Sequence, residues 1–257
     1  MSTPPPQPLV YFVLGTPGSG RREIIRDLVE NGLAEGERAL VLVPHTDAPN
    51  AAEATLATLT HAEIRRWSWQ PPELPSVALS NAAVVFFLSD ATADPITQLE
   101  ALKPWLEQHG AQLARVFCVV DCQLAEKQSA LRPWFEACIH FADVVFLARR
   151  AGVDNKWMSD FIGHFKKESF PCHFIQLKKG DLPNPALVLD PTPRRITQYF
   201  DEGESYAGVA ITKEDGEEAE EGDDEFVIPE DPYFVRNTAD RREKELPDIS
   251  HYLPAPE

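Results

Sequence analysis

The sequence predicts an α/β protein: a three-layer sandwich with a mostly parallel sheet of about six or seven strands, followed by a disordered acidic C-terminal tail. Short apolar runs of strand length alternate with amphipathic segments of helical period. A glycine-rich turn separates the first run from the first helical segment. Acidic residues concentrate late in the chain, because residues 201–231 hold fourteen Asp or Glu and one Lys. These residues account for −13 of the formal net charge of −17.

The apolar runs and the breakers between them set the order of the elements. Strands are expected at residues 9–14, 39–43, 82–88, 114–120, 142–148 and 172–177. Helices are expected after the glycine turn and at residues 50–67, 95–108, 124–139 and 154–167. Residues 191–200 form either a short helix or a docking segment. Strands and helices in alternation indicate a parallel sheet covered on both faces.

The chain divides into three regions. Residues 1–8 are rich in proline and are expected to be flexible, residues 9–200 form the folded domain, and residues 201–257 form the disordered tail. Residues 226–235 place two apolar patches within this acidic region. These patches bind a partner, fold back on the domain, or belong to a tail that only improves solubility.

The stretch from residue 9 to residue 25 carries the strongest functional signal, because a strand, a glycine turn and a helix follow one another. Its spacing is that of the phosphate-binding motif G-x-x-x-x-G-K-[ST]. Backbone N–H groups of such a loop point inward, and the helix offers its positive end to an anion. The alternative is that the glycines only build a tight turn. The candidate loop residues are Gly15, Thr16, Pro17, Gly18, Ser19, Gly20, Arg21 and Arg22.

The motif departs from this pattern at its last two positions. Arg21 stands where the motif has Lys, and a planar guanidinium is bulkier than the compact ammonium of Lys. Arg22 stands where the motif has the hydroxyl that binds Mg²⁺. The two arginines either hold phosphate through charge-assisted hydrogen bonds or pair with carboxylates and close the loop. Efficient hydrolysis is not expected in either case.

Three aspartates are candidates for positioning a metal ion or a water molecule. Asp90, Asp94 and Asp121 follow expected strands, and ligands of parallel sheets bind at the carboxyl ends of strands. No other metal site is expected. Cys118 and Cys122 flank Asp121, but their sequence context favours buried, inert thiols over ligands.

These residues make the chain resemble the CobW/HypB/UreG family of P-loop GTPases, and CobW-like members most, over about residues 9–180. Residues 88–95 resemble the family pattern E-S-[ST]-G-L-A-[DE]-P, and residues 119–122 resemble its VVDA. Residues 142–151 resemble A-D-x-x-L-L-N-K-x-D. The resemblance implies the P-loop NTPase fold, GTP or ATP with or without Mg²⁺ as ligand, and pairing into homodimers.

The departures from the family fall on its functional positions. Besides Arg21 and Arg22, the family's glutamate and glycine after the third strand are Leu88 and Ala91. The guanine-reading N-K-x-D is absent at residues 148–151, and no C-x-C-C metal motif lies near residues 60–75. The acidic residue expected after the second strand is not evident, although Asp47 can replace it.

The resemblance therefore implies a degenerate member, a pseudo-GTPase that acts by binding a nucleotide, another anion or a protein partner. One alternative is a divergent GTP- or ATP-binding NTPase or a nucleotide sensor. A second alternative is a scaffold that binds an unknown protein through the acidic tail. The residues argue against catalysis; if the chain is an enzyme, a P-loop nucleoside triphosphatase is expected.

Charge and hydropathy exclude other classes. A nucleic-acid partner is not expected, because residues 1–200 are nearly balanced, with 19 basic and 22 acidic residues. No run approaches the roughly 18 apolar residues of a membrane span. The N-terminus lacks the features of a secretory signal, and four cysteines suit a reducing compartment, so a cytoplasmic location is expected.

Overall fold

The computed structural model describes residues 7–79, 81–178, 181–201 and 230–253. Its seven strands form one sheet in the order β3-β2-β4-β1-β5-β6-β7, and every pairing is parallel. This sheet confirms the predicted α/β class. The strands are β1 (Leu9–Gly15), β2 (Ala39–Pro44), β3 (Ala62–Trp67), β4 (Val84–Leu88), β5 (Gln112–Asp121), β6 (Val144–Ala148) and β7 (His173–Gln176). The helices are α1 (Arg21–Asn31), α2 (Ala51–Leu56), α3 (Pro95–His109), α4 (Cys122–Lys127), α5 (Arg132–His140), α6 (Asn155–Lys167) and α7 (Pro185–Val188), with 3₁₀ turns at Ser129–Leu131 and Ile249–His251.

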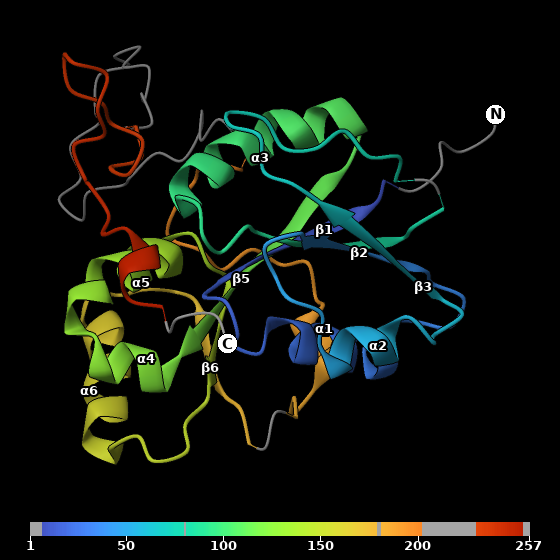
Figure 1. Ribbon diagram of the computed structural model, residues 1–257, viewed down its shortest axis with the longest axis horizontal. Coiled ribbons are helices and arrows are strands. Elements are labelled where there is room, and N and C mark those ends of the chain that lie inside the picture. The colour runs from blue at the N-terminus through green and yellow to red at the C-terminus, as the bar shows by residue number, and fades with distance from the viewer. Residues whose placement is uncertain (1–6, 80, 179–180, 202–229, 254–257) are drawn as a thin grey trace, which may run out of the picture.

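Helices cover both faces of the sheet, with α3 on the opposite side from α1 and α2 (Figure 1). Alternate residues of β1 divide between the two layers, as the two-residue period of a strand requires. Phe12 lies in the core beneath α3, α5 and α6, whereas Tyr11 and Val13 lie in the core beneath α1 and α7. Because β1 is the central strand, the loop that follows it is anchored in the most buried part of the molecule.

Residues 50–67, predicted as one helix, form instead the short helix α2 and the edge strand β3. The helix ends early because the N–H groups of Thr58 and Leu59 bond to carbonyls three residues back. The backbone then pairs with β2 in register, which brings Trp67 beside Pro44. Trp67 is buried, and its ring lies 5.1 Å from that of Phe87.

One other helix prediction is wrong, and the alternative left open for residues 191–200 is decided. Residues 124–139 form α4, a 3₁₀ turn and α5, because Pro133 lies in the first turn of α5 and cannot continue a preceding helix. Residues 191–200 contain no helix and follow the domain surface as a docking segment. There Arg195 pairs with the fully buried Asp143 at 3.3 Å, and the Tyr199 hydroxyl donates to the Glu100 carbonyl.

The tail prediction falls partly outside the described residues, which exclude residues 202–229 and 254–257. Residues 230–253, here called the C-terminal strap, fold back on α3 and α5. This was one of the alternatives for the two apolar patches, of which the structure describes only the second, in residues 230–235. Phe234 lies in the core and its ring centroid is 5.3 Å from that of Phe141. Asp231 pairs with His140 at 2.8 Å, and Arg242 pairs with Glu100 at 2.6 Å. The expected disorder therefore does not extend to the strap, because it buries aromatic side chains and forms ion pairs.

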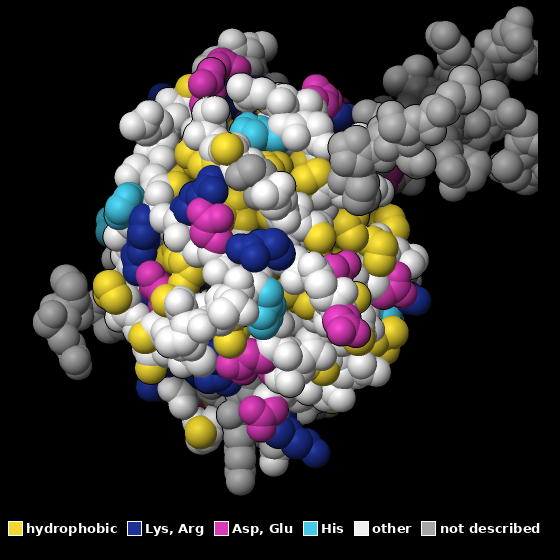
Figure 2. All heavy atoms as spheres, turned by 90° about the vertical axis from the view of Figure 1, so that its right-hand side faces the viewer, with side chains coloured by type: hydrophobic (Ala, Val, Ile, Leu, Met, Phe, Trp, Pro, Cys, Tyr) yellow, Lys and Arg dark blue, Asp and Glu magenta, His cyan; other side chains and the backbone are white. Residues whose placement is uncertain are grey.

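Helices long and apolar enough to cross a bilayer are absent from the part of the chain that the structure describes. Acidic and basic side chains are interspersed on the face of the molecule turned to the viewer in Figure 2. No extended area of a single charge is visible on that face. This distribution agrees with the nearly balanced charge of residues 1–200.

Candidate functional site

The predicted glycine loop joins β1 to α1 and has an unusual backbone. Gly15, Gly18 and Gly20 have φ values of 145°, 70° and 100°, in the region that favours glycine. A methyl group on Gly15 would lie 2.7 Å from the Val119 carbonyl oxygen, so the loop leaves the sheet in close contact with β5. The shape of the loop therefore accounts for its three glycines.

The N-terminus of α1 offers unused donors next to this loop. Gly20 occupies the N-cap position and supplies no capping side chain, so the first N–H groups of α1 keep their hydrogen-bonding capacity. The hydroxyls of Thr16 and Ser19 are buried and have no hydrogen-bond partner among the described residues. Such a combination of a positive helix end and unused donors is chemically suited to an anion.

The guanidinium of Arg21 is buried and turns toward β2 and β4. Its Nη2 donates to both carboxylate oxygens of Asp47 at 2.9 Å, and its Nη1 donates to the Ser89 carbonyl at 2.7 Å. Burial lowers the pKa of Arg21, and the negative charge of Asp47 opposes this shift. Arg21 is 3 % exposed, so Asp47 neutralises a cation that has almost no access to water.

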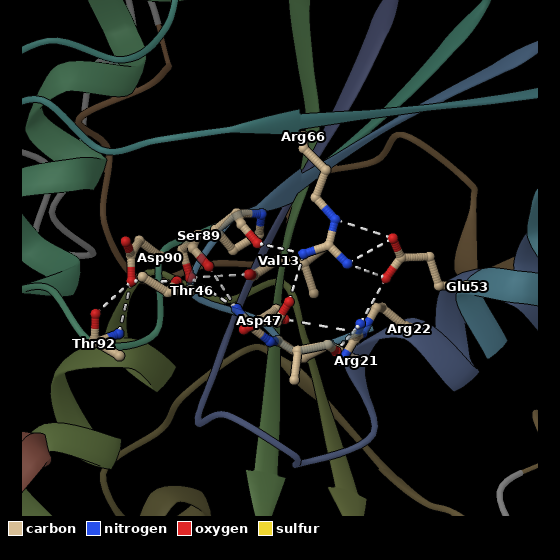
Figure 3. A network of polar contacts seen from close by, with 12 residues as sticks. Val13, Arg21, Arg22, Thr46, Asp47, Glu53, Arg66, Ser89, Asp90 and Thr92 are labelled. Carbon is tan, nitrogen blue, oxygen red and sulfur yellow. Dashed lines mark hydrogen bonds and ion pairs between the residues drawn. The ribbon is translucent and has the colours of Figure 1, made fainter. Parts of the chain in front are cut away.

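The guanidinium of Arg22 turns toward α2 and shares a carboxylate with a residue of β3. Arg22 Nη1 donates to Glu53 at 2.7 Å and to the Ala48 carbonyl at 2.6 Å. Arg66 donates to both oxygens of Glu53 through its Nη2, at 2.6 and 2.7 Å. Figure 3 shows Glu53 between the two guanidinium groups. We call Arg21, Arg22, Arg66, Asp47 and Glu53 the arginine–carboxylate network.

The network answers one question that the sequence left open. Both arginines after the glycine loop pair with carboxylates of the same chain, which is the closed alternative. Asp47, considered as a substitute for the acidic residue after the second strand, is the partner of Arg21. In the described conformation neither guanidinium is available to a ligand.

The structure separates the three aspartates proposed for a metal ion or water. Asp90 accepts hydrogen bonds from the hydroxyls of Thr46 and Thr92, at 3.0 and 2.7 Å, beside the network. Asp94 caps α3, and Asp121 caps α4. Two of the three carboxylates are therefore used to satisfy helix N–H groups.

Metal-binding clusters of three or more His, Cys, Asp or Glu side chains are not found among the described residues. All four cysteines are buried and free. Burial raises the pKa of Cys122 to about 12, so this thiol is neutral near pH 7. Cys118 and Cys122 are thus buried thiols, as the sequence predicted.

Sequence reasoning missed Glu53 and Arg66. Both lie in the segment predicted as one helix, which concealed their roles. Glu53 was detectable as the third residue after Asn50, whose side chain accepts from the Glu53 N–H at 2.9 Å in a typical N-cap. Arg66 becomes recognisable only when residues 62–67 are read as a strand, because it then lies at the carboxyl edge of the sheet.

No family model matches the chain, and no curated protein matches it. Among solved structures, the Zn(II)-bound YjiA GTPase from E. coli is 16 % identical with a TM-score of 0.42, and a triple mutant of YjiA GTPase is 15 % identical with a TM-score of 0.45. Each comparison covers 72 % of this chain and 61 % of the other. Similarity at this level says nothing of activity.

Proposed function

We propose that this chain is a P-loop-type binding protein that does not hydrolyse nucleoside triphosphates. The observation that supports the proposal most is the pairing of both arginines after the glycine loop with internal carboxylates. Hydrolysis by a P-loop needs a cation on the β- and γ-phosphates and a hydroxyl on Mg²⁺. Arg21 occupies the first of these sequence positions and is held by Asp47, and Arg22 occupies the second and has no hydroxyl.

The energetic cost of restoring an active arrangement is high. If Arg21 turned toward a phosphate, it would leave Asp47 buried without its bidentate partner. Breaking a buried ion pair in this way costs about 3–5 kcal/mol. A bound nucleotide would have to supply this free energy before it gained any affinity from Arg21. Arg21 therefore stays paired with Asp47 and stabilises the fold.

Anion binding through the backbone remains chemically reasonable. The left-handed Gly18 and Gly20 and the uncapped start of α1 leave N–H groups that need no side chain to attract phosphate. The ligand class that fits is a nucleoside triphosphate, GTP or ATP, or another polyphosphate, with or without Mg²⁺. These unused donors also favour a second candidate function, a nucleotide sensor in which binding rearranges the network.

Isothermal titration of the full chain with GTP, ATP, GDP and ADP, with and without Mg²⁺, tests both candidates. We expect binding without turnover above a buffer blank in single-turnover assays. Hydrolysis that clearly exceeds the blank and disappears in Arg21→Ala would overturn the proposed function. A complete absence of binding at millimolar ligand would remove the nucleotide sensor and leave a protein partner as the ligand.

A further inference from the structure

The carboxylates of Glu53 and Asp47 differ in how many cations they hold. Glu53 accepts from two guanidinium groups, those of Arg22 and Arg66. Asp47 has Arg21 as its close partner at 2.9 Å, whereas Arg22 Nε lies 4.0 Å away. Removal of one arginine therefore has different consequences at the two carboxylates.

Arg66 is held in place independently of Arg22. Its Nη1 donates to the carbonyls of Pro44 and Asp47, at the end of β2 and in the loop that follows, while its Nε and Nη2 hold Glu53. If Arg22 leaves, Glu53 keeps a bidentate guanidinium partner. If Arg21 leaves, Asp47 keeps no guanidinium within hydrogen-bond distance among the described contacts.

Position and exposure also distinguish the two arginines of the loop. Arg21 is 3 % exposed and Arg22 is 8 % exposed, and the Arg22 partner Glu53 has a side chain 15 % exposed. Arg22 lies in the first turn of α1, where side chains lean toward the N-terminal end of the helix and its unused N–H groups. Arg22 can therefore turn to the loop without crossing the core.

The network holds more guanidinium groups than carboxylates, with three of the first and two of the second. Two further carboxylates lie beside it and have other partners. Asp90 accepts from Thr46 and Thr92, and Glu23, in the first turn of α1, accepts from Asn50. If Arg22 moves to a bound polyphosphate, Glu53 loses one guanidinium but keeps its pair with Arg66.

We infer that Arg22 is the exchangeable cation of the loop: a polyphosphate draws its guanidinium away from Glu53, Arg66 keeps Glu53 neutralised, and Arg21 stays on Asp47. This inference rests on the proposed anion binding at the loop. It assigns a positioning role to Arg66, which belongs to β3 and not to the loop or α1. Arg66 supports ligand binding by reducing the hold of Glu53 on Arg22.

The test uses inorganic tripolyphosphate, titrated calorimetrically into the full chain and its variants. Arg22→Gln is expected to weaken binding about tenfold or more, because a charge-assisted contact is lost. Arg66→Gln is expected to weaken binding about tenfold as well, because Glu53 then holds Arg22 alone. Glu53→Gln is expected to strengthen binding, because it releases Arg22.

The matched control is Arg65→Gln, on the same edge strand. The Arg65 side chain pairs with Glu63 at 2.6 Å and donates to the Ala78 carbonyl, and no hydrogen bond or ion pair of the described residues joins it to the network. Arg65→Gln removes the same charge as Arg66→Gln. Because Arg65 belongs to an exposed pair, we expect this control to change the affinity for tripolyphosphate by less than about twofold. Equal losses of affinity in the two variants would show that Arg66 acts only through its charge. Such a result would overturn the inference that Arg66 releases Arg22 from Glu53.

Spectroscopy gives a readout that does not depend on the stability of a variant. In ¹⁵N-edited spectra of the wild-type chain, tripolyphosphate should shift the Arg22 Nε–H resonance and leave that of Arg21 unchanged. Binding by the wild type that Arg22→Gln leaves unchanged would overturn the inference alone. A wild-type chain that binds no tripolyphosphate at millimolar concentration would reject anion binding at the loop and the exchange together.

Discussion

Among the arginine doublets near carboxyl ends of strands in this sheet, those after β1 and β6 have opposite environments. Arg21 and Arg22 follow β1 and its loop, are buried, and pair with carboxylates at 2.9 and 2.7 Å. Arg149 and Arg150 follow β6. The Arg149 side chain is 55 % exposed and lies 3.6 Å from Asp121, and Arg150 donates to the Leu177 carbonyl at 3.4 Å.

The difference arises from the neighbouring elements. The segment from β2 to α2 brings Asp47 and Glu53 to the first doublet. The second doublet has only the α4 cap Asp121 as an ion-pair partner in the described part of the chain, and Arg150 lines a surface hollow of about 360 Å³ with Asn155 and Lys166. Arginines at strand ends therefore do not define an anion site; the carboxylates within reach decide whether the cations are available.

The largest effect is expected from Asp47→Ala. This change leaves Arg21 buried without its bidentate partner, so we expect the free energy of unfolding to fall by about 3–5 kcal/mol. Urea denaturation followed by circular dichroism measures the loss. Glu63→Ala removes the carboxylate of an exposed pair and serves as the control, with an expected loss below about 1 kcal/mol. Comparable losses in the two variants would erase the contrast between buried and exposed arginines.

An intermediate effect is expected from Gly15→Ala, which tests whether the first doublet depends on the close approach of its loop to β5. The new methyl group would meet the Val119 carbonyl at 2.7 Å and would force a φ of 145° on alanine. We expect a loss of about 2–3 kcal/mol in urea denaturation. Gly18→Ala is the matched control, because no atom lies within 4 Å of its added methyl group. It should cost about 1 kcal/mol, and a larger loss than that of Gly15→Ala would contradict the packing argument.

The smallest effect is expected from Arg149→Ala in the second doublet. The Arg149 side chain is exposed and its contact with the buried Asp121 is long, at 3.6 Å, so the free energy of unfolding should change by less than about 0.5 kcal/mol. Added salt should reduce even this difference, because exposed charges are screened. A loss above about 1 kcal/mol would show that the second doublet is as firmly paired as the first.

The sequence predicted six of the seven strands, because each of the six is an apolar run. It concealed β3 for a physical reason: an edge strand is only half buried, and its Ala, Glu and Arg residues are also good helix formers. The pairing with β2 that decides the outcome is a tertiary contact. The same error hid Glu53 and Arg66, whereas the glycine loop and Asp47 were recognisable from local pattern alone.

Trp67 gives the network an optical reporter of its own. It follows Arg66 directly, and its indole is buried against Phe87 with the ring of Trp69 at 6.5 Å. A shift of the end of β3 would change the surroundings of this fluorophore. Because the chain has five tryptophans, the part of the intrinsic emission that is lost in Trp67→Phe is the part that can follow the edge strand, on the timescale of stopped-flow mixing.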